Sequence, residues 1–354
     1  LSYPPGYAPD GALFVTAYCS CAVKIAFQRS VIMKTLKRLL SVALAATLAV
    51  GMACMTGCGN TAKADYRIGV LQVATHTALD AARDGFTETL NRWAEENGKT
   101  IEFDLQNAQG DQNNEKTIAA NLVAKNCDLL LGIATSSARA LATATTKIPT
   151  LFTAVTDPVV GHITGANVTG TSDMAPIDQQ IALVKKIVPD CKKVGFLYCG
   201  GEENSQKQIE LAKAQCEKIG LETRDFTVTA TSDIQTVVET IGSDIDVVYI
   251  PTDNLLAANM TLACNILTPK GIPVVAGEEG MCEDNEALAT LSIDYKKLGV
   301  QTAEMAIKIL TGEKKPADLP FEYYKQSATF VINENNAKAL LAKNSALKIT
   351  DADI

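Results

Sequence analysis

Three hydroxyl residues end an apolar run in the segment 129–141, LLLGIATSSARAL. The run stops at Thr135-Ser136-Ser137, and a helical-looking stretch follows that contains the only charged residue of the segment, Arg139. A helix start offers backbone N–H groups without intrahelical partners, and hydroxyls beside them suit an anion. The pattern leaves three interpretations open: a phosphate, a carboxylate, or no anion at all.

Polar residues also follow the other apolar runs, and none of them is Lys or Arg. They are Gln72, Thr75, His76, Asn107, Thr156, Asp157, Glu202, Asn204, Thr252, Asp253, Asn254, Glu278 and Glu279. The chain has no GxxxxGK phosphate loop, and its first run, GVLQVATHTA, lacks the GxGxxG turn of a dinucleotide fold. A carboxylate can be held by N–H and hydroxyl donors alone. We therefore expect a carboxylate ligand and no cofactor.

Residues for catalysis or metal binding are sparse. No GxSxG, HExxH or Cys–His signature occurs. His76 could act as a base, but a place at a helix start or in a pocket wall is the favoured interpretation. Asp253 and Asp294 could form a carboxylate pair, yet nothing nearby predicts a glycosidase cleft lined with tryptophan. His76 and His162 are the only histidines, so we expect no metal site and no enzyme.

The amino-terminal region has the pattern of an export signal. Residues 33–57 begin with three basic residues and continue with an apolar run, as a signal peptide does. The run ends in MTGC, which resembles a bacterial lipobox, so we expect cleavage before Cys58 and lipid on its thiol. Residues 58–65 would then be a lipid-anchored linker, and residues 1–32 are an upstream segment left out of the fold prediction. An uncleaved membrane anchor is the alternative, and both interpretations place the rest outside the cytoplasm.

The part of the chain after this signal is acidic. The formal net charge of all 354 residues is −8, although residues 1–58 carry five of the 32 basic and only one of the 40 acidic residues. Nucleic-acid binding requires clustered Lys and Arg, so nucleic acid is not an expected partner. Hydrophobic residues make up 47% of the chain, which is enough for the cores of two domains.

Six of the ten cysteines follow Cys58 and stand singly inside apparent strands and helices. None has the CxxC spacing of a metal or redox site. An exported protein could form disulfides, but we expect mostly free, buried thiols at Cys127, Cys191, Cys199, Cys216, Cys264 and Cys282.

Short apolar runs alternate with amphipathic stretches in two blocks, at about 66–155 and 193–277. Nearly continuous apolar runs predict strands of a parallel sheet that is covered on both faces. The predicted strands are 67–73, 101–106, 127–134, 148–155, 193–199, 221–228, 245–251 and 272–277. The predicted helices are 76–97, 112–126, 204–220, 231–242 and 254–271. The fold class is therefore α/β.

The remaining segments predict how the two blocks are joined. Residues 156–176 are rich in Gly and Thr, lack helical periodicity and look like a crossing between domains. Residues 287–310 predict one more strand and a long helix, and residues 312–320 a charged turn. A short strand pair and a helix near 333–343 close the chain. Two such lobes create a cleft, and ligands bind at the carboxyl ends of the strands in these folds.

Longer motifs resemble one family. The lipobox, the two blocks and the stretches ALDAARDGF, AVTDPVV, NVTGTSDMAP, KVGFLY, VVYIPTDN and ALATLSIDYKKLG are similar to the substrate-binding lipoproteins of ABC importers, in particular the tryptophan- and phenylalanine-binding receptors. The similarity covers nearly all of residues 65–345, and NVTGTSD and YIPTDN are its most specific parts. It implies a type I periplasmic-binding-protein fold: two lobes of doubly wound parallel sheet joined by a three-segment hinge.

This resemblance implies the lobe boundaries. The N-terminal lobe is expected at residues 66–175 plus 290–315, and the C-terminal lobe at 176–289 plus 316–354.

The resemblance also implies the site residues. It places an α-carboxylate at Thr135, Ser136 and Ser137, with Ala154 and Thr156 beside them, and an α-ammonium at Asp253 or, as second choice, Asp173. From the residues alone, helix capping remains the alternative role for the three hydroxyl residues and for Asp253. The alternative role for Asp173 is to fix the turn at the domain crossing. Asp157 is interpreted as a hinge residue rather than a ligand contact. The other expected ligand contacts are Gln72, Val73, His76, Asn204, Asn254 and Glu278.

The ligand side chain is less defined. Close members of the family tend to have an aromatic residue just after Leu-Gln, whereas this chain has Val73-Ala74-Thr75. A smaller or branched apolar amino acid is therefore as compatible as an aromatic one. We expect a monomeric, lipid-anchored receptor that delivers a hydrophobic or aromatic L-amino acid to an ABC permease with a cytoplasmic ATPase. The alternatives are a ligand sensor for a membrane signalling protein and an exported α/β enzyme, whereas a repressor of this fold would need a DNA-binding unit where the lipobox stands.

Overall fold

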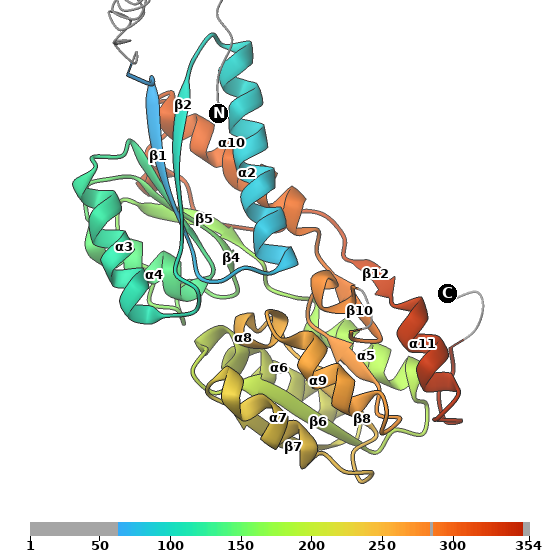
Figure 1. Cartoon of the computed structure of the whole chain (residues 1–354). Coiled ribbons are helices and arrows are strands. Elements are labelled where there is room, and N and C mark those ends of the chain that lie inside the picture. Colours follow the sequence, from blue (N-terminus) through green and yellow to red (C-terminus); the bar gives the residue numbers. More distant parts are fainter. Residues whose placement is uncertain (1–62, 284–285, 350–354) are drawn as a thin grey trace, which may run out of the picture. The chain divides into compact units, whose positions relative to one another are not determined.

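The computed structural model describes residues 63–283 and 286–349. Residues Ala64–Ile354 form one compact unit, distinct from Leu1–Lys63. The predictions for residues 1–32, for the signal peptide at 33–57 and for Cys58 lie outside the described residues. Within the compact unit, strands alternate with helices along the chain and form two lobes, each with its own sheet (Figure 1).

The N-terminal lobe is built on a six-stranded sheet in which every pair is parallel. Strands β3 and β4 are buried along their whole length, as the apolar runs predict. The strands, in spatial order, are β11 (Glu322–Tyr323), β5 (Val168–Ser172), β4 (Thr150–Val155), β3 (Leu129–Ile133), β1 (Tyr66–Gln72) and β2 (Ile101–Asn107).

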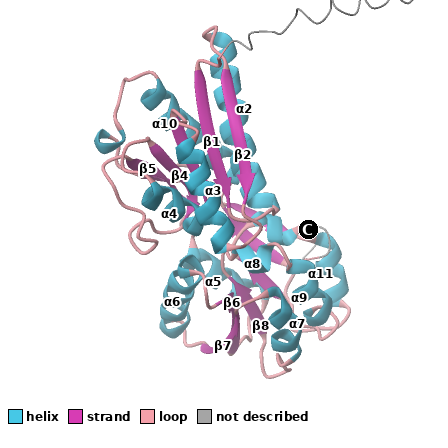
Figure 2. Ribbon diagram, turned by 60° about the vertical axis from the view of Figure 1, so that its left-hand side comes forward, coloured by secondary structure: helices cyan, strands magenta, loops and turns pink. Residues whose placement is uncertain are grey.

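Helices cover both faces of this sheet, as Figure 2 shows. On one face, Phe86 and Leu298 pack against the strand residue Ile68; on the other, Leu122 packs against Leu130. The helices of the first face are α2 (Thr77–Glu96) and α10 (Tyr295–Leu310), and those of the second are α3 (Gln112–Ala124) and α4 (Thr135–Ala144).

Two glycines allow α2 and α10 to lie in close contact. A Cβ atom on Gly85 would lie 2.0 Å from the carbonyl oxygen of Lys296, and a Cβ on Gly299 would lie 2.0 Å from that of Ala82. Both distances are far inside van der Waals contact, so only glycine fits at these positions. The pair attaches α10, which comes late in the chain, to a helix formed near its start.

The C-terminal lobe repeats this plan, with one antiparallel strand. Its six strands are parallel except for the β10–β12 pair. In spatial order they are β12 (Thr329–Ile332), β10 (Ala289–Ser292), β9 (Val274–Ala276), β8 (Val247–Ile250), β6 (Lys193–Cys199) and β7 (Glu222–Val228). Short 3₁₀ helices, η1 (Glu279–Cys282) and η2 (Pro316–Asp318), complete the two lobes.

Helices again cover both faces of the second sheet. Ile181 and Leu340 pack with Phe196 on one face, and Val238 packs with Val248 on the other. The helices are α5 (Ile177–Ile187), α6 (Glu203–Lys218) and α11 (Glu334–Leu341) on the first face, and α7 (Thr231–Glu239), α8 (Asn254–Ala257) and α9 (Met260–Leu267) on the second.

Three connections cross between the lobes in the described part of the chain: after β5, between β10 and α10, and between β11 and β12. The expected three-segment arrangement is therefore present, but two boundaries differ. Residue 290 falls inside β10, which pairs with β9 and β12, and residue 315 precedes β11, which pairs with β5. The sequence shows that these short strands exist but does not show which sheet they join.

Three further predictions are wrong in detail. The segment 156–176 contains β5, where a Cβ on Gly170 would lie 2.1 Å from the carbonyl oxygen of Phe152, so the glycine that suggested a loop permits close pairing. The last two strands do not pair with each other but join different sheets. The helix predicted at 254–271 is broken at Asn259, whose backbone is not helical and whose side chain takes the carbonyl of Leu255 at 2.7 Å.

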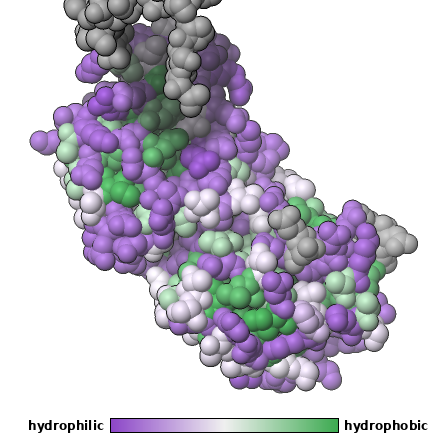
Figure 3. Space-filling view, viewed as in Figure 1, coloured by the Kyte–Doolittle hydropathy of each residue, from purple (hydrophilic) through white to green (hydrophobic). Residues whose placement is uncertain are grey.

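The surface seen in Figure 3 is mostly hydrophilic, with a hydrophobic area over α7 and α9. Apolar side chains are gathered instead in cores on both faces of each sheet. Among the helices of residues 63–283 and 286–349, none combines the length and the apolar character needed to cross a membrane.

Candidate functional site

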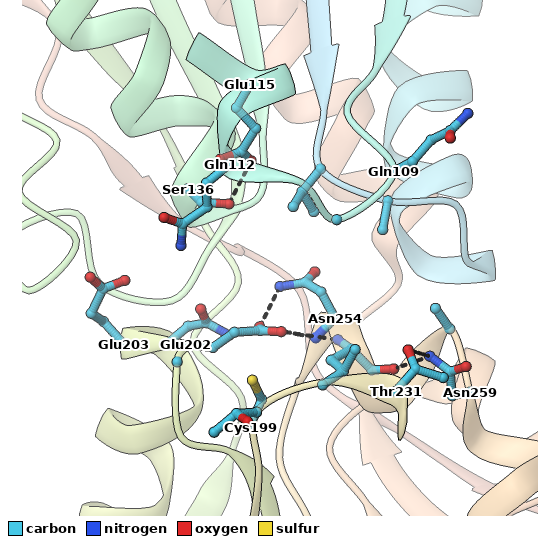
Figure 4. A pocket seen from close by; sticks show the side chains of 18 of the residues that line it. Gln109, Gln112, Glu115, Ser136, Cys199, Glu202, Glu203, Thr231, Asn254 and Asn259 are labelled. Atoms are coloured by element: carbon cyan, nitrogen blue, oxygen red, sulfur yellow. Dashed lines mark hydrogen bonds between the residues drawn. The ribbon is translucent and has the colours of Figure 1, made fainter. Parts of the chain in front are cut away.

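Two cavities that share wall residues lie between the lobes, at the carboxyl ends of the strands. The larger, of about 250 Å³, is lined by segments that follow β1, β2 and β3 on one side and β6, β7 and β8 on the other (Figure 4). The smaller has about 20 Å³. Both are lined by Asn204 and Asn254. This is the position where open α/β sheets bind ligands.

Three buried atoms without hydrogen-bond partners line the smaller cavity. They are His76 Nδ1, Asp173 Oδ1 and Glu278 Oε1. Only two other buried side-chain N or O atoms lack a partner in the described residues, on Thr89 and Asn336. Unpaired buried polar atoms are uncommon and costly, so three of them around one small cavity indicate a ligand group.

Asn254 determines the protonation of His76. The Asn254 Nδ2 donates to Glu202 Oε2 at 2.7 Å, so its Oδ1 is the atom 3.3 Å from His76 Nε2. Nε2 must then carry the hydrogen, and burial lowers the pKa of His76, which keeps the ring neutral. His76 Nδ1 is therefore an acceptor that faces the cavity.

Asp173 and Glu278 each hold one oxygen firmly in the protein and have no hydrogen-bond partner at bonding distance for the other, although the Thr156 hydroxyl lies near Asp173. The Tyr295 hydroxyl donates to Asp173 Oδ2 at 2.8 Å, and the Gly280 amide donates to Glu278 Oε2 at 2.6 Å. Burial raises the pKa of Asp173 to about 6 and that of Glu278 to about 8. Since a buried carboxylate is disfavoured without a cation, both groups favour a positively charged ligand group.

Asp253, the first choice for an ammonium contact, has no free oxygen. Its Oδ1 accepts from the Leu256 amide at 2.9 Å and caps α8, and its Oδ2 accepts from the Cys199 amide at 2.6 Å. Burial and the nearby charge of Glu202 raise its pKa to about 8. The geometry supports the capping alternative: Asp253 ties α8 to the end of β6 and contributes only a wall of the cavity.

Two of the hydroxyls expected to bind a carboxylate, those of Ser136 and Ser137, are used within the protein. Ser136 and Ser137 donate to Glu115 Oε1 at 2.7 and 2.9 Å. Thr135 packs its methyl group toward Gly161, where a Cβ would lie 2.7 Å away. Of the three hydroxyl residues only Ser136 lines the larger cavity, and its hydroxyl is taken by Glu115.

Some of the other expected residues line the cavities, and others make hydrogen bonds that hold the surrounding loops in place. Val73 lines the larger cavity, and Ala154 and Thr156 line the smaller one. Asn204 donates to the carbonyl of Thr252 at 3.0 Å. Gln72 lines neither cavity, because its Nε2 donates to the carbonyl of Ala74 at 2.6 Å and holds the turn after β1.

Sequence reasoning missed four residues of the site. Glu115 and Arg139 line the larger cavity, and Tyr295 lines the smaller. Gln208 donates to Thr156 Oγ1 at 3.0 Å from the opposite lobe. Glu115, Arg139 and Gln208 lie within helices, so a search of the residues just after each strand could not find them; Tyr295 follows β10 by three residues and could have been found in this way. Arg139 also corrects the expectation that no base reaches the site, although its charge is paired with Glu203 at 2.6 Å.

No cluster of His, Cys, Asp or Glu within residues 63–283 and 286–349 has the arrangement needed for a metal ion. The six predicted thiols are free and buried. Burial raises the pKa of Cys199, which lines the larger cavity, to about 11. This thiol is therefore not a nucleophile at neutral pH.

Comparison with protein families identifies the chain. Residues 67–348 match the family model described as ABC transporter substrate binding protein. The chain belongs to this family. It is the substrate-binding component of an ABC transporter and not an enzyme, and the family implies an extracytoplasmic position.

Two relatives, each 35% identical to this chain, support this assignment. A tyrosine-binding protein of Clostridioides difficile (strain R20291) is 35% identical over 323 residues, which are 86% of this chain and 92% of the relative. The solved L-Trp complex of an ABC domain from Streptococcus pneumonia has 35% identity and a TM-score of 0.74, and covers 81% of this chain and 97% of that chain.

A third relative was solved without ligand. The ligand-free, open structure of a substrate-binding protein with adhesive properties from Clostridium difficile has 36% identity and a TM-score of 0.62, and covers 82% of this chain and 98% of that chain. The resemblance to ABC importer receptors and the expected fold are confirmed.

Proposed function

We propose that this substrate-binding protein captures a free L-amino acid with an aromatic side chain and delivers it to an ABC permease. The observation that carries the proposal is the set of three acceptors around the smaller cavity, on His76, Asp173 and Glu278. An α-ammonium group has three N–H donors and a positive charge, which match three acceptors that include two carboxylates. A cavity of about 20 Å³ has room for such a group but not for a whole amino acid.

The rest of the ligand would occupy the larger cavity. Its α-carboxylate would lie in this cavity too, away from the Glu115 carboxylate that already accepts from the Ser136 and Ser137 hydroxyls at the start of α4. Val73, Ala74 and Leu255 provide apolar wall for a side chain. The ligands in the printed names of two relatives, tyrosine and L-Trp, support an aromatic ring in this space.

Attachment to the membrane is part of the proposal and rests on the sequence. Lipid on Cys58 would hold a monomeric receptor at the outer face of the membrane, near its permease. Replacing Cys58 with Ser should release the protein from bacterial membranes into the soluble fraction. Continued membrane retention would favour the uncleaved apolar anchor instead.

Thermal unfolding of the full chain in detergent, with each of the twenty amino acids, tests the ligand class. We expect tyrosine, tryptophan or phenylalanine to raise the melting temperature, because a ligand that binds the folded state stabilises it by mass action. Tyramine and N-acetyl-tyrosine, which lack the carboxylate and the charged amine, should fail. The proposal is wrong if no amino acid shifts the transition while a sugar or a nucleoside does.

A further inference from the structure

Glu115 is a buried carboxylate in the wall of the larger cavity. It lies in the first turn of α3, is 3% exposed and faces the cavity beside Ser136 (Figure 4). Neither a strand end nor the three-acceptor cluster of the smaller cavity includes it. Its position therefore needs a separate explanation.

The hydrogen bonds of Glu115 leave half of its carboxylate unused. Ser136 and Ser137 both donate to Oε1, at 2.7 and 2.9 Å. Within the described residues no hydrogen bond to Oε2 is found. The two serine bonds fix the plane of the carboxylate and leave Oε2 as an acceptor of defined direction.

No cation of the described residues is paired with Glu115. The nearby Arg139 makes its ion pair with Glu203, at 2.6 Å. Burial raises the pKa of Glu115, which the serine hydrogen bonds counter only in part. Oε2 is open to the cavity, and a ligand that covers it must supply an uncharged donor to avoid the cost of an unpaired acceptor.

The positions of the two cavities determine which part of the ligand would carry that donor. The ammonium acceptors line the smaller cavity, and Asn204 and Asn254 line both cavities, so the two spaces adjoin. Glu115 lines the larger cavity from the N-terminal lobe, with Val73 and Ala74 as apolar residues of the same wall. A ligand anchored by its ammonium group would thus direct its side chain across apolar wall toward an oxygen acceptor.

We infer that Glu115 determines side-chain specificity by accepting a hydrogen bond from a phenol O–H or an indole N–H. This inference rests on the proposed function and adds a selection within the aromatic amino acids. The site then favours tyrosine and tryptophan over phenylalanine, because an unfilled buried acceptor is costly when the ligand has no donor.

Binding of matched ligand pairs to the full chain in detergent tests the inference. The pairs are L-tyrosine with L-phenylalanine and L-tryptophan with 1-methyl-L-tryptophan, each measured by titration calorimetry. In the wild type, the donor-bearing member of at least one pair should bind about 10-fold to 100-fold more tightly. In Glu115→Gln, the side-chain carbonyl can still accept from the serines, but the amide N–H₂ opposes the ligand donor. This preference should therefore fall below about threefold.

Gln112→Ala is the control, since it removes a side chain from the wall of the same cavity without removing the proposed acceptor or the Arg139–Glu203 ion pair. It should change the affinities within a pair by the same factor. A ligand-free melting temperature of Glu115→Gln close to that of the wild type establishes that the variant is folded. Should the amide variant unfold, Ser136→Ala, which removes one of the bonds that orient the carboxylate, should reduce the same preference.

The outcomes separate the inference from the proposed function. If the wild type binds aromatic amino acids but does not prefer the donor-bearing ligands, or if Glu115→Gln lowers all affinities equally, the inference is wrong and the proposed function stands. If the wild type binds no amino acid, the proposed function itself fails.

Discussion

The hydrogen bonding of single carboxylate oxygens separates Asp253 from the other buried acids of the smaller cavity. Asp253 gives both oxygens to backbone amides, whereas Asp173 and Glu278 each keep one oxygen free toward the smaller cavity. All three are almost fully buried, so burial alone does not distinguish them. The number of unpaired oxygens indicates which of them a ligand would contact.

Asp253→Ala should destabilise the protein even without ligand. The change leaves the buried amides of Leu256 and Cys199 without acceptors and removes a helix cap, at a cost of about 2–4 kcal/mol. Thermal unfolding of the ligand-free protein measures this loss. Asp294→Ala, which removes a partly exposed cap of α10, is the control and should cost about 1 kcal/mol. If Asp253→Ala leaves the stability unchanged but abolishes ligand binding, Asp253 contacts the ammonium group of the ligand instead.

Ligand affinity should rise between pH 5 and pH 8. Burial raises the pKa of Asp173 to about 6 and that of Glu278 to about 8, so part of each group is protonated in this range without ligand. A bound ammonium favours the ionised forms, and binding should release protons. Calorimetry in buffers of different ionisation enthalpy measures this release. Asp173→Asn should reduce the pH dependence, and an affinity that falls as the pH rises would contradict the assignment.

Ligand-free stability should show the opposite trend. For both carboxyls the pKa is higher in the folded than in the unfolded protein, so their favourable contribution is complete below about pH 4. It is lost as the pH rises through about 6 and then about 8, by an amount on the order of a few kcal/mol. Urea unfolding at a series of pH values measures the slope, and a stability that rises across this range would count against both shifts.

The sequence predicted the neighbourhood of the site better than its contacts. The strand-end rule found His76, Asn204, Asn254 and Glu278, because the carboxyl ends of parallel strands meet at one edge of a sheet. It could not predict that the Ser136 hydroxyl donates a hydrogen bond to Glu115, because Glu115 lies on another helix. Side-chain hydrogen bonding between elements depends on packing, which local patterns do not encode.

At the scale of elements, the α2–α10 contact fixes the N-terminal lobe. The two helices approach so closely that Gly85 and Gly299 have no room for a side chain. The sequence pattern predicted both helices, since apolar residues recur at helical spacing, but it contained nothing to show that they pack together. The same limit explains why β10 and β11 were given to the wrong lobes.

Gly299→Ala should destabilise the N-terminal lobe. The added methyl carbon would lie 2.0 Å from the carbonyl oxygen of Ala82, so the helices must separate, at a cost of about 1–3 kcal/mol. Chemical unfolding measures the change. Gly200→Ala is the control, because a Cβ there has its nearest neighbours at 3.9 Å and the cost should be small. A Gly299→Ala variant as stable as the wild type would contradict the crowding, since alanine also has the higher helix propensity.

At the scale of the whole molecule, residues that line the two cavities also form contacts between the lobes. The Arg139–Glu203 ion pair spans the cleft at 2.6 Å, and His76 meets Asn254 across it. Ligand binding that engages both lobes would shift the balance between open and closed arrangements toward the closed one. The TM-score to the tryptophan complex, 0.74, is higher than the TM-score to the ligand-free, open relative, 0.62, so the two lobes are arranged more like those of the complex.

Arg139→Gln should weaken ligand binding by no more than about fivefold. The ion pair is partly exposed, and such pairs contribute about 0–1 kcal/mol. High salt should lower the wild-type affinity toward that of the variant, because screening removes the same interaction. Calorimetry at low and high ionic strength measures both effects. A variant whose affinity is as salt-sensitive as that of the wild type would exclude a role of this pair in closure.

The late position of α10 and β11 in the chain has a consequence for biogenesis. Thr169 donates to the carbonyl of Leu319, and Thr171 lies 2.7 Å from Thr302, so the first lobe needs residues synthesised after the whole of the second sheet's parallel core. During export from the amino terminus, the side of α2 that contacts α10 would stay uncovered until about residue 310 has emerged. Nascent chains that stop earlier would expose Phe86 and its neighbours, which makes them targets for proteases and chaperones.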